Sequence, residues 1–242
     1  MQETMLQEVM AAPREIRFDR VPVPTAGPGQ VLVKIKRIGI CGSDIHVYHG
    51  KHPYTKYPVT QGHEVSGQVA ALGEGVTQFQ VGQRVTIEPQ VYCGECYPCT
   101  HGKYNLCENL KVMGFQTTGT ASEYFAVDAS KVTALPAGMS YDEGAMLEPL
   151  AVTVHAARRA GDVAGKKVCV LGCGPIGILL VQSEGLWRGR GHGHRYLRLS
   201  AGAGPHLRSG LRCQHQNPPL WRGSDGVLRP RQGGHHLRLR GQ

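Results

Sequence analysis

The chain has 242 residues, 40% of them hydrophobic, eight cysteines and a formal net charge of +9. No apolar run is long enough to span a bilayer, and the polar start Met1-Gln2-Glu3-Thr4 is not that of a signal peptide, so we expect a cytoplasmic protein of one large or two modest domains. The charge is concentrated after Glu184, where eleven arginines meet a single acid, Asp225, whereas the preceding 184 residues carry a net charge of −1.

Short stretches of alternating apolar and polar residues indicate strands in the first third of the chain. They cover residues 31–38, 65–71 and 81–85, and an extended lead-in and a turn precede them at residues 21–24 and 27–29. Closely spaced strands separated by glycine turns are typical of a small, partly open β-barrel.

The stretch from Ile40 to Glu64 contains a candidate catalytic metal site. Cys41, His63 and Glu64 offer a thiol, an imidazole and a carboxylate, which are three usual donors to a tetrahedral zinc whose fourth position stays open. Ser43 and His46 add a hydroxyl and a second imidazole, which are groups able to pass a proton onward from a bound alcohol. The alternative for a single cysteine or histidine is a buried or surface group without a metal.

Four further cysteines lie close together in the sequence, at Cys93, Cys96, Cys99 and Cys107. Four thiolates on one loop suffice to close a tetrahedral zinc shell, which predicts a structural site. Two disulfides, a redox dithiol or an iron–sulfur cluster are the alternatives, and the zinc-like donors upstream favour zinc.

A capping box at Ser140 predicts a helix running towards Ala160, with a bend at Pro149. Glu148 stands among apolar residues of this helix, either as a solvated acid or as a group with a buried partner. A short apolar strand over residues 166–171 then leads into Gly172-Cys173-Gly174-Pro175-Ile176-Gly177 and an expected helix, which is the context that a dinucleotide fingerprint needs. Gly172, Gly174, Pro175, Ile176 and Gly177 are the expected cofactor-binding residues.

Cys41-Gly42-Ser43-Asp44, followed by Gly62-His63-Glu64 and the four-cysteine cluster, resembles the zinc-dependent medium-chain alcohol and polyol dehydrogenases over about residues 5–182. The resemblance implies an α/β protein with a GroES-like, partly open β-barrel catalytic domain at residues 1–150. The start of a Rossmann dinucleotide-binding domain follows at residues 151–182 and is incomplete. Glu148 would be an exchangeable or second-shell ligand of the catalytic zinc, and the four cysteines would form the family's structural zinc lobe.

Residues 183–242 depart from that family pattern. They are rich in arginine, glycine and histidine and lack lysine, isoleucine and phenylalanine, so we expect disorder. No acid stands where the fingerprint requires one, because residues 193–196 read Gly-His-Arg-Tyr. We hypothesise that this tail is a frameshifted reading of the rest of the domain, which the coding DNA across Gln182 would test. Nucleic-acid binding by the arginines is the disfavoured alternative, because aromatic residues are sparse there.

The sequence therefore predicts a zinc-dependent, NAD- or NADP-linked oxidoreductase of a small-molecule secondary alcohol, of polyol or sugar-acid type. In the mechanism that the resemblance implies, zinc polarises the hydroxyl, hydride passes to the nicotinamide, and Ser43 and His46 carry the proton. We expect this chain to be an inactive form that does not assemble into the family's homo-oligomer. A zinc-stabilised binding module without catalysis is the alternative.

Overall fold

The computed structural model describes residues 3–161, 163, 168, 170, 172 and 174–187, together with four short strands between residues 197 and 230. The chain divides into two compact units, Met1–Glu148 and Pro149–Gln242, and each is described by itself. None of the helices within these described ranges is long and apolar enough to cross a membrane.

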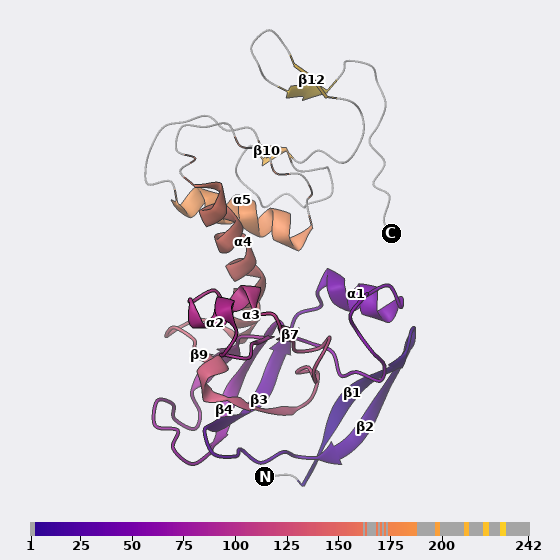
Figure 1. Ribbon diagram of the computed structural model, residues 1–242, viewed down its shortest axis with the longest axis vertical. Helices are drawn as coiled ribbons and strands as arrows, with labels where there is room; N and C mark the ends of the chain where they lie inside the picture. Colours follow the sequence, from indigo (N-terminus) through magenta and orange to yellow (C-terminus); the bar gives the residue numbers. More distant parts are fainter. Residues whose placement is uncertain are drawn as a thin grey trace. The chain divides into compact units, whose positions relative to one another are not determined.

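The first unit is built on a five-stranded antiparallel sheet (Figure 1). Its strands, in spatial order, are β8 (Tyr124–Asp128), β3 (Gln30–Ile38), β4 (Val65–Leu72), β5 (Arg84–Ile87) and β9 (Val132–Ala134). Inward-facing valines of the central strands, among them Val33, Val69 and Val85, are at most 1% exposed and form the main core.

The connection between the two edge strands shows that the sheet is strongly curled. β8 and β9 lie at opposite edges, yet only the 3₁₀ turn η2 (Ala129–Lys131) joins them. A flat sheet would separate these edges by about 19 Å, since neighbouring strands lie about 4.8 Å apart. The connector reaches about 14 Å at full extension. The sheet must therefore curl towards closure, which confirms the partly open barrel predicted from the strand spacing.

The strands predicted at residues 31–38 and 65–71 are confirmed as β3 and β4. The strand predicted from residue 81 begins later, at Arg84, because Gly82 adopts φ 90° in a turn that leaves Val81 66% exposed. A hairpin of β1 (Thr4–Ala12) and β2 (Glu15–Pro22) was not predicted beyond the extended lead-in. Its tight turn contains Arg14 at φ 67°, a position for which the sequence offers no glycine.

The helices of this unit differ in part from the sequence prediction. α1 (Gly42–Tyr48) follows the first candidate ligand and was not expected as a helix. The capping box at Ser140 is confirmed and starts α3 (Tyr141–Ala145). The predicted bend at Pro149 is wrong, because the chain breaks at Met146 and a new helix, α4 (Leu147–Ala160), begins there. Pro149 thus lies in the first turn of α4, where its missing N–H has no intrahelical partner to lose.

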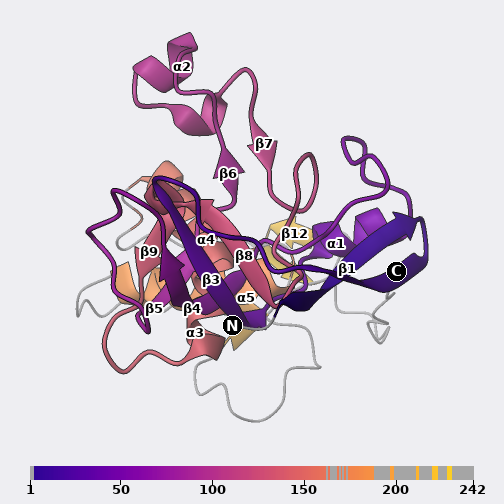
Figure 2. The ribbon, with the colours of Figure 1, turned by 90° about the horizontal axis from the view of Figure 1, so that it is seen from below.

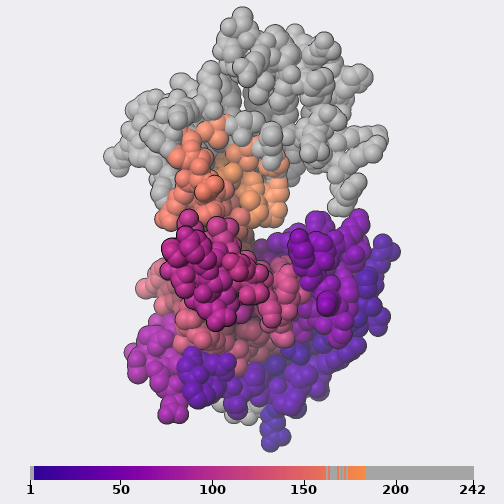
Figure 3. All heavy atoms as spheres, viewed as in Figure 1, coloured from indigo at the N-terminus to yellow at the C-terminus, as the bar shows by residue number. Residues whose placement is uncertain are grey.

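A small lobe projects from the barrel between β5 and β8 (Figure 2). It contains β6 (Gln90–Val91), α2 (Tyr97–Thr100), η1 (Tyr104–Leu106) and β7 (Lys111–Val112), and β6 pairs with β7 at its base. Around α2 the lobe forms part of the surface that faces the viewer in Figure 3, where it is magenta.

The second unit contains most of α4, then α5 (Pro175–Trp187), β10 (Leu197–Arg198), β11 (Leu211–Arg212), β12 (Leu220–Arg222) and β13 (Leu228–Pro230). β10 pairs with β11 in parallel, and β12 pairs with β13 in antiparallel fashion. Of the strand predicted at residues 166–171, only Val168 and Val170 are described, and neither is in a strand. The disorder expected of residues 183–242 concerns positions that lie, for the most part, outside the described residues.

Candidate metal centres

Cys41, His63 and Glu64 come together at the ends of β3 and β4. One ligand atom from each lies within 4.8 Å of the other two. Cys41 caps α1, while His63 and Glu64 directly precede β4 and are 5% and 9% exposed. The sequence brings them together because β3 and β4 pair up to Ile38 and Val65, so the segments that follow and precede these strands are neighbours.

Glycines make room for this cluster. Gly62 has φ 92°, and a Cβ there would lie 2.3 Å from Cδ1 of Ile38. At Gly39, an added Cβ would lie 2.2 Å from Oε2 of Glu64, and the Gly39 N–H donates to the Glu64 carbonyl at 2.7 Å. The carboxylate of Glu64 therefore occupies space that only a glycine at position 39 leaves open.

Asp44 holds the two halves of the cluster together, and sequence reasoning did not single it out. It is 8% exposed, its Oδ2 accepts the Cys41 N–H at 2.8 Å, and its Oδ1 lies 3.7 Å from Nδ1 of His63. Within the described part of the chain this buried Nδ1 has no hydrogen-bond partner. In metal sites, a histidine commonly binds the metal through one ring nitrogen while a carboxylate beside the other nitrogen fixes the orientation of the ring. The sequence signal that could have identified Asp44 is its place in the run Cys41-Gly42-Ser43-Asp44.

Burial governs the protonation of these groups. Desolvation lowers the pKa of His63 and raises that of Asp44, and each opposes the other's shift through its charge. A lowered histidine pKa favours the neutral imidazole, which is the form that binds a metal. Desolvation, followed by the nearby Asp44 charge, also raises the pKa of Glu64.

Glu148 lies outside the group of donors within 4.8 Å of one another but close enough to feel its charge. Desolvation, then the charges of Glu64 and Asp44, raise the pKa of Glu148 to about 7. This half-buried position differs from that of a solvated helix acid. The carboxylates of Asp44 and Glu148 lie near Glu64 and repel its charge. A divalent cation held by Cys41, His63 and Glu64 would relieve this repulsion, so these three residues fit zinc.

Ser43 and His46 lie on α1 next to the cluster. The Ser43 N–H donates to Sγ of Cys41 at 3.5 Å, and its side chain is half-buried, whereas His46 is exposed. Residues three apart on a helix are neighbours on one face. Ser43 therefore lies beside the cluster, and His46, on the same face of the helix, lies at the surface.

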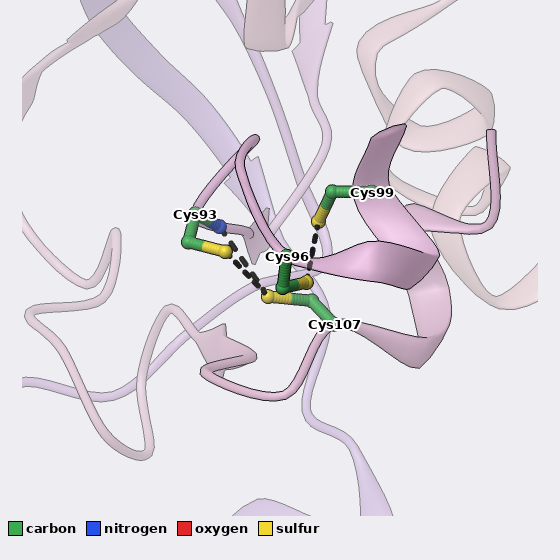
Figure 4. A group of neighbouring side chains, drawn as sticks. All are labelled: Cys93, Cys96, Cys99 and Cys107. Carbon is green, nitrogen blue, oxygen red and sulfur yellow. Dashed lines mark hydrogen bonds between the residues drawn. The ribbon is translucent and has the colours of Figure 1, made fainter. Parts of the chain in front are cut away.

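The four cysteines of the lobe form a second cluster, and Figure 4 shows their sulfur atoms pointing towards one another. All four sulfurs lie within 4.8 Å of one another. The Cys96–Cys99 and Cys93–Cys107 sulfur pairs are 3.4 and 3.5 Å apart, too far for the disulfides weighed as an alternative. The backbone N–H groups of Glu95 and Cys96 stabilise the Cys93 thiolate and lower its pKa to about 6, whereas desolvation raises the pKa of Cys99 to about 12. Such a set fits a closed zinc site.

The predicted dinucleotide fingerprint is described in part, because Cys173 lies outside the described residues. Gly172 has φ 102°, and a Cβ on Gly177 would lie 2.1 Å from the carbonyl oxygen of Gly172. A Cβ on Gly174 would meet nothing within 4 Å, so its backbone is open to a close approach. Pro175 and Ile176 begin the first turn of α5; Pro175 has no N–H, and the free N–H groups that follow it favour an anion.

Comparison with known proteins finds similarity to zinc-dependent dehydrogenases. Residues 27–137 match the alcohol dehydrogenase GroES-like domain. A sorbitol dehydrogenase from Halalkalibacterium halodurans is 48% identical over 162 residues, which are 66% of this chain and 47% of that protein. The chain spans about half the length of the curated relatives it matches.

Solved structures agree with the sequence relatives. The rspB alcohol dehydrogenase from Escherichia coli CFT073, complexed with the cofactor NADH, superposes with a TM-score of 0.75 at 35% identity, covering 82% of this chain and 58% of that one. A cobalt- and zinc-bound thermostable alcohol dehydrogenase from Pyrobaculum aerophilum gives a TM-score of 0.71 at 30% identity, covering 80% and 59%. Residues 27–137 therefore form an alcohol dehydrogenase GroES-like domain, and the N-terminal part of the chain is similar to zinc-dependent alcohol and polyol dehydrogenases.

Proposed function

We propose that residues 1–150 are the zinc-binding catalytic domain of an NAD- or NADP-linked dehydrogenase of secondary alcohols, of polyol or sugar-acid type. The observation that carries this proposal is the convergence of Cys41, His63 and Glu64, whose ligand atoms lie within 4.8 Å of one another. These three side chains would hold the catalytic zinc, with Glu148 next to them as an exchangeable or outer ligand.

The reaction divides between the bound groups and the protein. Zinc would supply Lewis-acid polarisation of the alcohol, and the nicotinamide would supply the hydride acceptor. Ser43 would accept the hydroxyl proton and pass it to His46, which is exposed and can release it to water. Neutral His63 and the buried carboxylates would keep the ligand set fixed while the proton moves.

The four-cysteine lobe would hold a structural zinc, and residues 151–182 would begin the Rossmann domain. Gly172, Gly174 and Gly177 supply a positive φ, an open backbone and a close contact, which are the three features that pyrophosphate binding at this turn needs. The fingerprint acid is absent at residues 193–196, so the sequence does not distinguish NAD from NADP.

We also infer that the 242-residue chain has no catalytic turnover by itself, because residues 183–242 depart from the family pattern that would continue the nucleotide-binding domain. The alternative function is a zinc-stabilised binding module without chemistry. The binding module predicts that the four-cysteine lobe binds zinc and that the Cys41 site does not.

Two measurements, the number of bound zinc ions and catalytic turnover, distinguish the dehydrogenase domain from the binding module. The chain, purified with zinc and dialysed, is expected to retain two ions, and Cys41→Ala is expected to retain one. One ion in the unmodified chain, unaffected by Cys41→Ala, would contradict a catalytic site and favour the binding module. Turnover with NAD or NADP on a panel of polyols and sugar acids, at the rate of a full-length relative, would contradict the inferred inactivity.

A further inference from the structure

Gln61 is a buried polar side chain beside the candidate catalytic site that no role above uses. It is 8% exposed. Its side-chain amide Nε2 donates to the Asp44 carbonyl at 3.2 Å and to Asp44 Oδ1 at 3.3 Å. Oδ1 is the same oxygen that lies 3.7 Å from Nδ1 of His63. The amide and the imidazole therefore meet at one carboxylate oxygen.

The backbone of Gln61 is held on both sides, which fixes the direction of its side chain. Its N–H donates to Oε2 of Glu8 at 2.9 Å, and its carbonyl accepts the Ala121 N–H at 2.9 Å. Gly119 packs so closely that an added Cβ would lie 2.3 Å from the Gln61 carbonyl oxygen. A side chain that starts from such a fixed backbone loses little further freedom when it makes its own hydrogen bond.

Gln61 supplies a side-chain donor that reaches Oδ1 of Asp44 at 3.3 Å, in addition to the backbone hydrogen bonds that the carboxylate accepts from Cys41 and Gly62. The Cys41 N–H binds Oδ2 at 2.8 Å, whereas His63 stands beyond hydrogen-bond distance of Oδ1. A buried carboxylate that loses a hydrogen-bond donor turns towards its remaining partners. The Gln61 amide supplies a neutral donor that keeps Oδ1 of Asp44 facing the imidazole of His63.

We propose that Gln61 is a positioning residue of the catalytic metal site, acting through Asp44 on His63. The inference rests on the proposed function, since it concerns the affinity of that site for zinc. Gln61 would not touch the metal or the substrate. Its amide would set the orientation of Asp44, and Asp44 would set that of the ligand His63.

The decisive variant is Gln61→Met, which keeps the length and apolar stem of the side chain and removes its donor. Outer carboxylate partners of metal-binding histidines typically contribute 10- to 100-fold in metal affinity, so the loss of a donor to that carboxylate is expected to weaken zinc binding at this site about tenfold. Gln61→Glu replaces the donor by an acceptor next to Asp44 and is expected to weaken it further. The matched control is Gln68→Met, because Gln68 Nε2 donates to the Gly82 carbonyl at 2.9 Å away from both clusters.

Competition with a chelator gives two zinc affinities per chain, and the four-cysteine lobe serves as the internal reference. Cobalt in place of zinc adds an absorption spectrum that reports the ligand geometry. We expect Gln61→Met to change the affinity and spectrum of the Cys41 site alone, and Gln68→Met to change neither. Unchanged affinity and spectrum in both Gln61 variants would overturn the inference.

The outcomes separate this inference from the proposed function. If Cys41→Ala removes one metal ion and Gln61→Met leaves both affinities unchanged, the catalytic site stands and the role of Gln61 fails. If Cys41→Ala removes no metal ion, the proposed function fails first. Equal loss at both clusters in Gln61→Met would indicate general unfolding and would also overturn a site-specific role.

Discussion

Replacement of Gly39 by alanine tests whether Glu64 is held as a metal ligand. Gly39 does not adopt a left-handed φ, so alanine introduces a steric effect and no backbone strain. The new Cβ would lie 2.2 Å from Oε2 and 2.9 Å from Cβ of Glu64. Favourable carbon contacts lie near 3.5 Å, so the carboxylate must move by more than about 1 Å. The backbones cannot separate easily, because the Gly39 N–H donates to the Glu64 carbonyl at 2.7 Å.

A shift of this size is large compared with what a metal site tolerates. Ligand distances in zinc sites vary by about 0.2 Å, so a carboxylate displaced by about 1 Å no longer ligates. We expect Gly39→Ala to lower zinc affinity at the Cys41 site at least about 100-fold, the upper end of what an outer partner contributes. Overpacking would add about 1–3 kcal/mol of destabilisation.

The assay is zinc retention against a graded series of chelator concentrations, with a thermal melt of the same samples. Gly42→Ala is the matched control, because a Cβ there meets nothing within 4 Å, and it is expected to behave as the unmodified chain. Retention of both zinc ions by Gly39→Ala at unmodified affinity would refute the assignment of Glu64 as a ligand.

Three further predictions concern the other parts of the chain. Cys96→Ser should leave one zinc ion per chain by elemental analysis, because the lobe loses a thiolate, and retention of two ions would contradict the structural site. Gly177→Ala should speed amide hydrogen exchange at the start of α5, because its Cβ would lie 2.1 Å from the Gly172 carbonyl oxygen, whereas Gly174→Ala, which meets nothing within 4 Å, should not. The pKa of Glu148 is raised to about 7, so the folded metal-free chain holds a proton that the unfolded chain releases nearer pH 4.5, and stability from this group is lost as pH rises through about 7. In chelator, Glu148→Gln should therefore raise Tm more at pH 8 than at pH 5, and an equal effect at both values would contradict the shift.

The spacing of donors in the sequence was enough to predict which side chains come together in the two clusters. Cys41, His63 and Glu64 meet as expected, and so do the four cysteines, because each set lies on short segments with few possible arrangements. Glu148 was expected as a possible ligand and lies outside the group of closely spaced donors, although its raised pKa places it within reach of their charge.

Contacts between distant segments were not predictable in the same way. Gly39 and Gln61 are important because of what packs against them, and that depends on the register of β3 with β4 and on the position of Gly119. The β1–β2 hairpin was missed because its turn uses Arg14 with a positive φ instead of a glycine or asparagine. The break at Met146 was missed because proline is tolerated in a first turn as well as at a bend.

The short connector between β8 and β9 has a consequence for the order in which the barrel assembles. Both edge strands must find the central strands before three residues can span the gap, so closure is expected to come late in folding. The buried Lys131 of this connector also places its ammonium 3.5 Å from the ring centre of Tyr92, the residue before Cys93. The cation thus connects the turn that joins the two edge strands of the barrel with the segment from which the cysteine lobe begins.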